Sequence, residues 1–453
     1  MTPPRRRPIV WTCVLLWAGG CNGSDRSAGF EITLTQSEPI PTVFTATWDV
    51  GLDSLEAAWF ELELDGQVAR TVLVDVSADG PYTTVLIGMK PASEYVVRAV
   101  VQADGDLSTS ADHVVTTGLE PPELPDLSVE RSEGVQTWSG LLVSSIVALP
   151  SAAVILDEDG DYVWWTISED SDMIARSVLS HDGRSVLFMG INSEGEDESL
   201  LHEVSLDGTD HQETRLQDAH HDFAELPDGS IAYLAFDPRE LGGLTVWGDR
   251  LMERDPEGNT IELYNAWDDE LAEYDPTIPA DAELWPHANA MNYLPEDDAY
   301  LVSFSTLDSI YRIDRQSHHV DWRLGGAHSD FERADGSSDY FQHQHQMQLL
   351  EDSILVFVNG GMGQSDLSRA VELSRDGSSF EAQEIWEYWS DPPLECLALG
   401  DVHRFDNGNT LVTYSYQGLI QEVTPHGEPV WTLTASVGGV LGYSTWMAGP
   451  PSQ

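Results

Sequence analysis

The chain has 453 residues, more than one compact domain usually holds, so we expect several domains. It carries 78 acidic and 21 basic residues, and the formal charge of −57 excludes nucleic acid as a partner and unaided binding to an anionic membrane. Hydrophobic residues make up 41% of the chain, enough to form folded cores.

The first residues have the pattern of an export signal. Three arginines precede an apolar run at 9–17 that is too short to span a bilayer, and small residues precede Cys21 as in a bacterial lipobox. We predict a signal peptide at 1–21, lipidation of Cys21 and a tether at 22–29. The mature chain would then be an exported lipoprotein of the outer membrane, on the periplasmic face or the cell surface. Cleavage without lipid is the alternative, because Ala18 replaces the usual leucine.

Residues 30–118 alternate apolar and polar side chains with a period of two. Seven short segments of this kind predict a β-sandwich. The segment resembles a fibronectin type III domain, with Trp48 as the core tryptophan and MKPASEY at 89–95 in the place of the tyrosine corner. Such a module usually serves as a spacer or a binding arm. A stiff, proline-rich linker is expected at 119–133.

Residues 134–449 repeat a loose unit of about 40–55 residues, the period at which propeller blades recur. Six outer hairpins predict six blades, at 155–165, 203–212, 253–267, 312–324, 372–389 and 422–433. We expect strands near 135–149 to pair with those near 441–446 and close the ring. The predicted fold class is therefore all-β, a six-bladed β-propeller with an N-terminal β-sandwich.

Histidines recur where the inner strands of the propeller begin. Two of them lie two residues apart in YFQHQHQMQLL, and others precede comparable apolar segments: His343 and His345, then His220, His221, His287 and His403. Counted back from the inner turns, His220 and His343 lie nine residues upstream, His345 seven and His403 five. Because side chains alternate along a strand, these odd offsets predict one shared face around the axis. His221 and His287 break the parity and require a bulge or a position before the strand.

A ring of imidazoles has three possible roles. Neutral imidazoles bind transition metals. One imidazole can act as a covalent nucleophile while others serve as acid, base and anion donors. The histidines can also be buried, hydrogen-bonded structural groups. The residues alone leave all three open.

Four segments resemble, in order and at blade spacing, the bacterial arylsulfotransferases, a family of exported six-bladed propellers. They are HHDFAELPDGS, WPHANAMNYLPEDDAYLVSFS, QHQHQMQLL and GDVHRFDNGNTLV, and the likeness covers about 135–433. The resemblance implies transfer of a sulfuryl group from an aryl sulfate to a phenol through a sulfated histidine. It implies no cofactor and no metal, and contact with a membrane only through a lipid anchor.

The resemblance also assigns residues. The nucleophile lies in a Q-H motif, which matches Gln344 and His345. His221 and His287 match histidines that hold the sulfuryl oxygens and protonate the leaving phenolate, and Asn289 would orient that strand. Three further histidines are candidates for substrate binding by parity alone: His220, His343 and His403.

The sequence departs from the family at one position. The family has an arginine in the strand after H-x-N, whereas this chain has Thr306, which cannot supply a cationic fork. Arg323 and Arg404 are candidate substitutes. The departure leaves open an altered donor, weak activity, or a non-catalytic surface lipoprotein that binds a glycan or protein. The sequence does not determine the oligomeric state.

Overall fold

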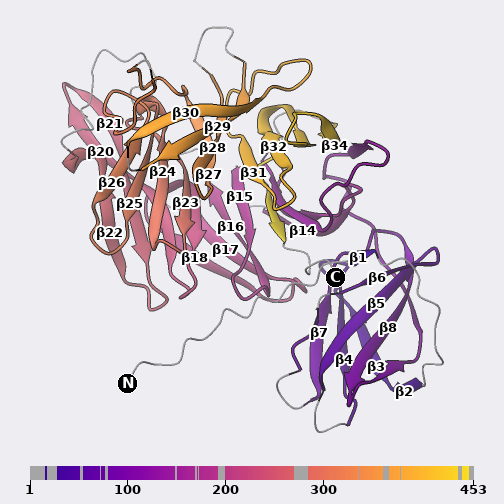
Figure 1. Ribbon diagram of the computed structural model, residues 1–453. Helices are drawn as coiled ribbons and strands as arrows, with labels where there is room; N and C mark the ends of the chain where they lie inside the picture. The colour runs from indigo at the N-terminus through magenta and orange to yellow at the C-terminus, as the bar shows by residue number, and fades with distance from the viewer. Residues whose placement is uncertain are drawn as a thin grey trace.

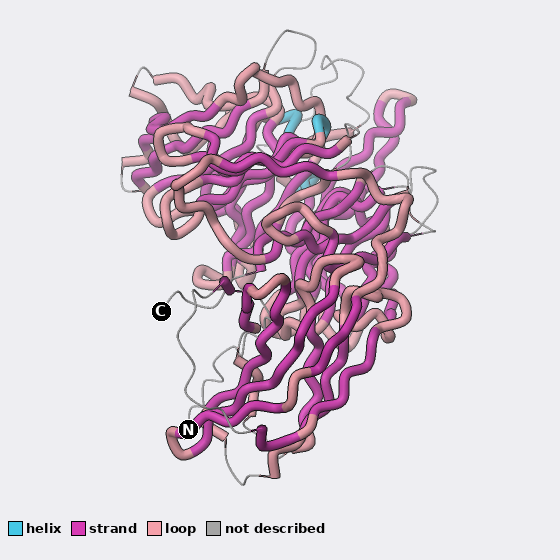
Figure 2. Tube along the Cα trace, turned by 90° about the vertical axis from the view of Figure 1, so that its right-hand side faces the viewer, coloured by secondary structure: helices cyan, strands magenta, loops and turns pink. Residues whose placement is uncertain are grey.

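The computed structural model describes residues 28–447 except 52–54, 72, 77–79, 148–149, 169–170, 172, 192–198, 270–283, 335, 361–366, 378 and 437–440, together with a short strand β1 (Leu16–Trp17). The described chain is almost all strand and turn, with helical structure confined to short 3-10 turns (Figures 1 and 2). None of its helices is long and apolar enough to cross a membrane. The predicted lipidation site Cys21, the rest of the signal peptide and nearly all of the tether lie outside the described residues.

The N-terminal part is a sandwich of two sheets. The smaller sheet contains β3 (Ile32–Gln36), β4 (Phe44–Trp48) and β7 (Tyr82–Leu86). The larger sheet has the order β1-β6-β5-β8-β9-β2, with β10 paired to β8; its strands are β2 (Ala28–Phe30), β5 (Ala57–Leu64), β6 (Gln67–Arg70), β8 (Glu94–Ala103), β9 (Asp106–Ser110) and β10 (His113–Thr116).

Alternation of side chains explains this sandwich, because every second residue of a strand faces the opposite sheet. Trp48 is buried in the shared core and stacks on Tyr82. The Tyr95 hydroxyl accepts a hydrogen bond of 2.9 Å from the backbone N–H of Lys90, as in a tyrosine corner. The two-sheet architecture is thus observed, while the likeness to fibronectin type III remains a prediction.

Six further sheets form the propeller over the described residues. The first contains β12 (Leu141–Ile146), β13 (Ser151–Leu156), β14 (Tyr162–Ser168) and β35 (Thr445–Met447); the second, β15 (Met173–Leu179), β16 (Ser185–Ile191), β17 (Ser199–Ser205) and β18 (His211–Leu216); the third, β19 (Ala219–Glu225), β20 (Ile231–Leu241), β21 (Leu244–Arg254) and β22 (Thr260–Asn265).

The remaining three sheets repeat this pattern. The fourth contains β23 (Ala288–Leu294), β24 (Ala299–Phe304), β25 (Ser309–Asp314) and β26 (Val320–Leu324); the fifth, β27 (Gln344–Leu349), β28 (Ser353–Val358), β29 (Arg369–Asp376) and β30 (Glu381–Tyr388); the sixth, β31 (Asp401–Arg404), β32 (Thr410–Tyr414), β33 (Leu419–Val423), β34 (Pro429–Ala435) and β11 (Leu127–Arg131). Within each of the four sheets from the second to the fifth, consecutive strands pair antiparallel.

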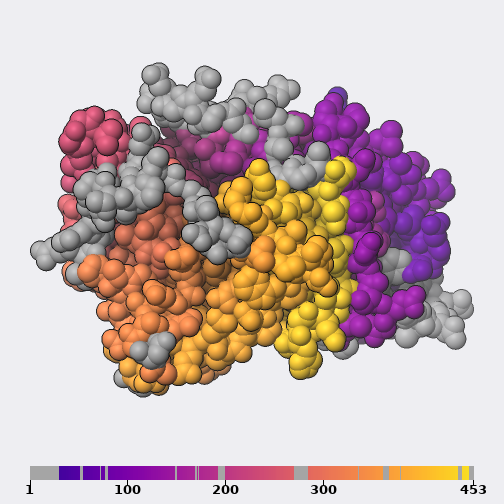
Figure 3. Space-filling view, turned by 90° about the horizontal axis from the view of Figure 1, so that it is seen from above, coloured from indigo at the N-terminus to yellow at the C-terminus, as the bar shows by residue number. Residues whose placement is uncertain are grey.

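Both ends of the propeller segment are paired into sheets. At the C-terminal end, β35 pairs with β12, as the sequence predicted for the closing strands. At the N-terminal end, β11 adds a fifth strand to the sixth sheet by pairing with β34. Residues 127–131 therefore correct the predicted linker, because they form a strand whose backbone pairs with the free edge of β34. Figure 3 shows the yellow residues of the late chain directly against purple residues of the early chain.

The sandwich and the propeller share a hydrophobic core. Ile40, Val43 and Ile87 of the sandwich are buried in one cluster with propeller residues such as Val163 and Leu206. Hydrogen bonds cross the same boundary: the Ser37 hydroxyl donates to the Asp207 carbonyl at 2.7 Å, and the Thr42 hydroxyl donates to the Val163 carbonyl at 2.8 Å. The module is thus packed onto the first and second propeller sheets.

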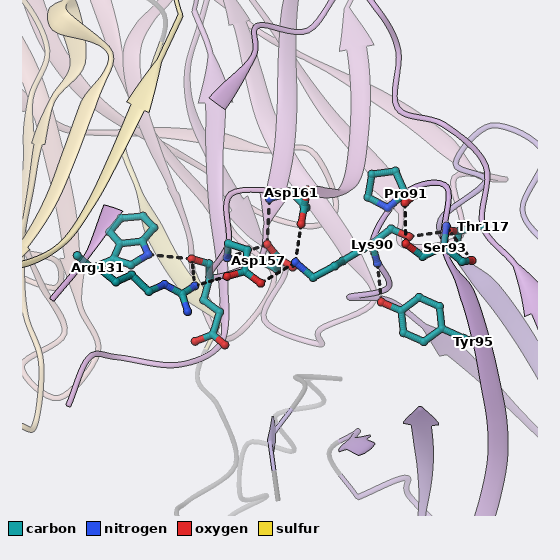
Figure 4. Close-up of polar contacts among 11 residues, drawn as sticks. Lys90, Pro91, Ser93, Tyr95, Thr117, Arg131, Asp157 and Asp161 are labelled. Atoms are coloured by element: carbon teal, nitrogen blue, oxygen red, sulfur yellow. Dashed lines mark hydrogen bonds and ion pairs between the residues drawn. The ribbon is translucent and has the colours of Figure 1, made fainter. Parts of the chain in front are cut away.

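Lys90, the only lysine of the chain, anchors this boundary. Its ammonium lies 2.9, 2.7 and 2.5 Å from carboxylate oxygens of Asp157, Asp159 and Asp161, which occupy the turn between β13 and β14 (Figure 4). Burial disfavours the charge on Lys90, but the three carboxylates together raise its pKa above the ordinary value. The hydrogen bond to Tyr95 holds the lysine backbone in place, so the tyrosine corner presents this cation to the propeller.

We predict that Lys90→Met lowers the free energy of unfolding by about 1–3 kcal/mol, because three carboxylates lose their shared cation. Urea unfolding measures the change. Adding Asp159→Asn to Lys90→Met should recover part of the loss by removing one repelling charge, and Lys90→Arg should retain most of the stability. Unchanged stability of Lys90→Met would show that the shared hydrophobic core alone holds the domains together.

Candidate active site

The structure brings five histidines together from the third, fourth and fifth sheets. Nδ1 of His220 lies 2.8 Å from Nδ1 of His221, and Nε2 of His221 lies 3.4 Å from Nε2 of His287. The rings of His343 and His345 have centroids 5.5 Å apart. After burial, nearby histidines further lower the pKa of His345, with His343, His287 and His221 all contributing. We call these five residues the histidine cluster.

Three members of the histidine cluster have left-handed backbone. The φ angles are 54° at His221, 61° at His287 and 48° at His343. Residues other than glycine rarely adopt this conformation, and it is concentrated at functional sites. The turn of the chain at each position directs an imidazole away from the direction that regular alternation would give.

Bulges in the inner strands correct the parity prediction. The register shifts between His220 and Phe223 in β19, and between Gln344 and Met347 in β27. An unpaired residue moves every side chain beyond it to the opposite face, so offsets counted from the inner turn do not report the face of a residue before the bulge. His221 and His287 join the cluster through a bulge and a position before the strand, as the sequence analysis required of them.

His345, the predicted nucleophile, is only 4% exposed. Its Nδ1 lies 2.6 Å from Oδ1 of Asn359, whose amide nitrogen donates to the carbonyls of Cys396 and Leu399 at 2.7 and 2.9 Å. The amide orientation makes Oδ1 an acceptor, so Nδ1 of His345 carries the proton. Nε2 then has the lone pair, and it accepts a hydrogen bond of 3.1 Å from the backbone N–H of Leu399.

The electrostatics keep four members of the histidine cluster neutral, namely His220, His221, His287 and His345. Burial lowers the pKa of His220, His221 and His287 to about 3 in each case, and it lowers the pKa of His345 well below its usual range. Burial has the opposite effect on Asp249, whose pKa rises to about 7 although the N–H of Ala288 donates to it at 2.8 Å.

Asp249 lies beside His220 of the histidine cluster. Its Oδ1 lies 3.0 Å from Nε2 of His220, without the alignment of a hydrogen bond. The His220 ring is also stacked on the Phe236 ring, with centroids 3.8 Å apart. His220 is therefore a buried, packed residue whose Nδ1 contacts Nδ1 of His221.

The next layer along the strands contains a buried ion pair that the sequence analysis missed. Arg176 on β15 makes two hydrogen bonds to Asp222, at 2.5 and 3.2 Å. Asp222 also accepts from the side chain of Gln346 at 2.7 Å and from the backbone N–H of Met291 at 2.8 Å. Arg176 lies over the Tyr443 ring, 5.0 Å from its centroid. A buried arginine thus lies on an inner strand, but a carboxylate neutralises it.

The two arginines proposed as substitutes lie elsewhere. Arg323 is on β26, the fourth strand of its sheet, and pairs with Asp269 at 3.0 Å. Arg404 is on β31 but pairs with Glu372 at 2.9 Å. Arg323 lies on an outer strand, and both arginines are paired with carboxylates. Neither contacts the histidine cluster within the described chain.

Other predicted residues have structural partners. Asn289 donates from its amide to the Gln344 carbonyl at 2.7 Å and so joins β23 to β27. The Gln344 amide donates to Ser303 and to the carbonyl of Ser309, both at 3.0 Å. The Thr306 hydroxyl donates to the Pro286 carbonyl at 2.9 Å.

His403 is not brought into the cluster. Its ring lies against Phe405, with centroids 5.2 Å apart, and burial lowers its pKa. It belongs to the sixth sheet, and the residue near His345 is instead Leu399, which precedes β31 and contributes its backbone N–H. Shared parity therefore did not place it beside the other histidines.

A sequence signal for the missed layer exists. Three of its members on inner strands each precede, by four residues, the residue whose N–H closes the inner turn: Arg176 before Ser180, Asp222 before Leu226 and Gln346 before Leu350. The turns themselves differ in length, since Ser180 bonds to Ser185 but Leu350 to Ser353. The histidine offsets were counted back from residues beyond these turns, so equal offsets did not correspond to equivalent positions on the inner strands.

A family model described as Arylsulfotransferase (ASST) matches residues 137–433. No curated protein matches the chain. Among solved structures, the chain is similar to a protein of unknown function from Bacteroides caccae, with 11% identity and a TM-score of 0.42 over 68% of this chain and 98% of that chain. It is also similar to a streptogramin B lyase, with 12% identity and a TM-score of 0.39 over 68% of this chain and 98% of that chain.

We predict that His287→Gln changes the pH dependence of stability. The folded-state pKa of His287 is about 3, below the ordinary value of 6.5, so between these pH values only the unfolded state holds the proton. Wild-type stability should gain up to about 1.4 kcal/mol per pH unit from this group as pH rises through that window. Urea unfolding from pH 4 to 8 should show a gain that is smaller in His287→Gln than in wild type by this contribution, because His220, His221 and His345 still add to the slope.

His319→Gln is the matched control, because His319 is an exposed histidine in the turn after β25. Its stability should follow the wild-type curve at every pH. Parallel curves for wild type and His287→Gln would contradict a neutral, buried His287.

Proposed function

The chain belongs to the arylsulfotransferase family, and from this membership and the geometry of the histidine cluster we propose that it transfers a sulfuryl group from an aryl sulfate to a phenol through a sulfated His345. The observation that carries the proposal is the tautomer of His345. Asn359 holds the Nδ1 proton, which leaves the Nε2 lone pair available as a nucleophile once the Leu399 N–H releases it.

In the first half-reaction, Nε2 of His345 attacks the sulfur of the aryl sulfate. The N–S bond forms as the bond from sulfur to the aryl oxygen breaks, and the phenolate leaves with the electron pair. A neutral imidazole N–H from His221 or His287 donates toward the departing oxygen or the sulfuryl oxygens. These two residues suit that role because their nitrogens lie 3.4 Å apart on neighbouring sheets.

In the second half-reaction, a phenol enters in place of the first product. An imidazole of the cluster accepts its proton, the phenolate oxygen attacks sulfur, and the N–S bond breaks to return the electron pair to Nε2. In both half-reactions the proton stays on Nδ1 of His345, where it is hydrogen-bonded to Oδ1 of Asn359. No cofactor enters either step.

An anionic substrate changes the electrostatics of the cluster. The histidines are neutral in the absence of substrate, since burial lowers their pKa. A bound sulfate ester favours the charged form of a neighbouring imidazole and raises that pKa. The cation that the family takes from an arginine would then come from a protonated histidine, because Arg176 is already paired with Asp222.

A second candidate function is non-catalytic binding of a glycan or protein on an inherited propeller. Two observations favour it: both ring nitrogens of His345 are hydrogen-bonded, and the buried Arg176 is neutralised. A binding protein needs neither a free nucleophile nor a free channel cation. The two functions differ in whether His345 is required.

We also propose that the chain is exported and anchored to the outer membrane through lipid on Cys21. The support is the basic, apolar and small-residue pattern before that cysteine. Metabolic labelling with a fatty-acid probe tests the anchor, and label that persists after Cys21→Ser would contradict it.

We predict that the purified protein releases nitrophenol from p-nitrophenyl sulfate when a phenol acceptor is present. His345→Ala should reduce kcat/KM by at least about 10³, because the covalent route is lost. With donor alone, mass spectrometry of the wild type should find one added SO3 group on the peptide that contains His345. His426→Ala, in an exposed turn of the sixth sheet, should keep wild-type activity.

A second variant tests the tautomer. Asn359→Leu removes the acceptor for Nδ1, so we expect kcat to fall about 10²–10⁴-fold, as when a catalytic histidine loses the group that sets its tautomer. The imidazole ¹⁵N shifts of His345 should report the changed tautomer, which a purely structural role for Asn359 would leave unchanged. Equal nitrophenol release by wild type and His345→Ala, or none by the wild type, would favour the binding function.

A further inference from the structure

A second group of metal-ligating side chains lies on the second propeller sheet, away from the inner strand. The sheet has the order β15-β16-β17-β18, and the group lies on its third and fourth strands. His202 of β17 pairs directly across the ladder with Glu213 of β18. His211 lies two residues before Glu213 on the same strand, so the two share a face.

The three donor atoms are spaced for one ion. Nδ1 of His202 lies 2.9 Å from Nε2 of His211 and 3.8 Å from Oε1 of Glu213, and Nε2 of His211 lies 3.9 Å from the same oxygen. The circle through three points at these separations has a radius of about 2.1 Å, which equals the usual Zn–N and Zn–O bond length. An ion in the plane of these three atoms can therefore contact all of them at that length, and small rotations of the side chains would give the tetrahedral arrangement that zinc takes in proteins.

The surroundings suit an ion that enters from solvent. The His202 side chain is 4% exposed and its ring is stacked on Phe188, 4.6 Å between centroids, so this ligand is held rigidly. The side chains of His211 and Glu213 are 46% and 49% exposed. One fixed ligand and two accessible ligands leave a fourth position open to water.

We propose that His202, His211 and Glu213 bind a Zn²⁺ ion that joins β17 to the outermost strand β18. Two imidazoles and one carboxylate are a donor set that zinc takes in proteins. The bound ion replaces the direct contact between the two imidazoles, and each nitrogen donates its lone pair to the metal. The site is separate from the histidine cluster and does not depend on sulfuryl transfer.

This metal site was not expected from the sequence, because the family resemblance implied no metal. Spacing along one strand shows only H-x-E, which is two ligands. The third ligand comes from the neighbouring strand through the register of the ladder, and that register is a property of the folded sheet.

The test is a Zn²⁺ titration of untagged, full-length protein after chelator treatment, monitored by competition with a chromophoric chelator. Wild type should bind one ion per chain at this site, and His211→Ala and Glu213→Gln should each weaken that binding at least about tenfold. Both altered residues are exposed, and circular dichroism should confirm that the variants fold. His319→Ala, which removes an exposed histidine elsewhere, should bind as wild type does.

Thermal unfolding provides a second readout. Zn²⁺ should raise the Tm of wild type and of His319→Ala, because a ligand of the folded state stabilises it, but not that of Glu213→Gln. Equal zinc binding by wild type and the two site variants would overturn the proposal, as would binding that is lost in His287→Gln instead. Neither readout uses sulfuryl transfer, so the result is independent of the proposed enzymatic function.

Discussion

The carboxylate of Asp222 is the interaction on which the centre of the propeller depends. It accepts hydrogen bonds from Arg176 of the second sheet, Met291 of the fourth and Gln346 of the fifth. A buried carboxylate without partners would carry a large desolvation cost, and here five donor groups offset it, two of them from Arg176 and one from the backbone N–H of Phe223. Because Asp222 follows His221 and Gln346 follows His345, the same carboxylate sets the relative position of two candidate active-site strands.

This arrangement explains why the site is neutral. Arg176, the one buried arginine among the residues that the structure describes, is paired with Asp222, and burial keeps His220, His221, His287 and His345 uncharged. The surface of the protein is strongly acidic, so it does not attract an anionic ester over long distance. Recognition of a sulfate ester would have to arise at short range, from imidazole N–H groups and from the protonation that a bound anion induces.

The N-terminal sandwich is more than a spacer in this structure. It shares a hydrophobic cluster with the propeller and places Lys90 among three carboxylates of the first sheet. The strand β11 that follows it completes the sixth sheet. A spacer or arm joined by a stiff linker was expected from the prolines at 119–128, but the domains are connected through side chains as well as through the chain.

The sequence by itself determined the all-β class, the sandwich, the repeat of outer hairpins, the pairing of the two ends of the propeller and membership of a histidine-bearing family. These follow from local alternation and turn residues, which neighbouring positions specify. Only the tertiary structure decided which histidines meet. Bulges in β19 and β27 and unequal inner turns change the face of a residue without a clear local signature, so parity wrongly included His403 and missed Arg176. Partners such as Asn359 for His345, or His202 for Glu213, come from other strands, and their approach depends on ladder register and ring closure across the whole fold.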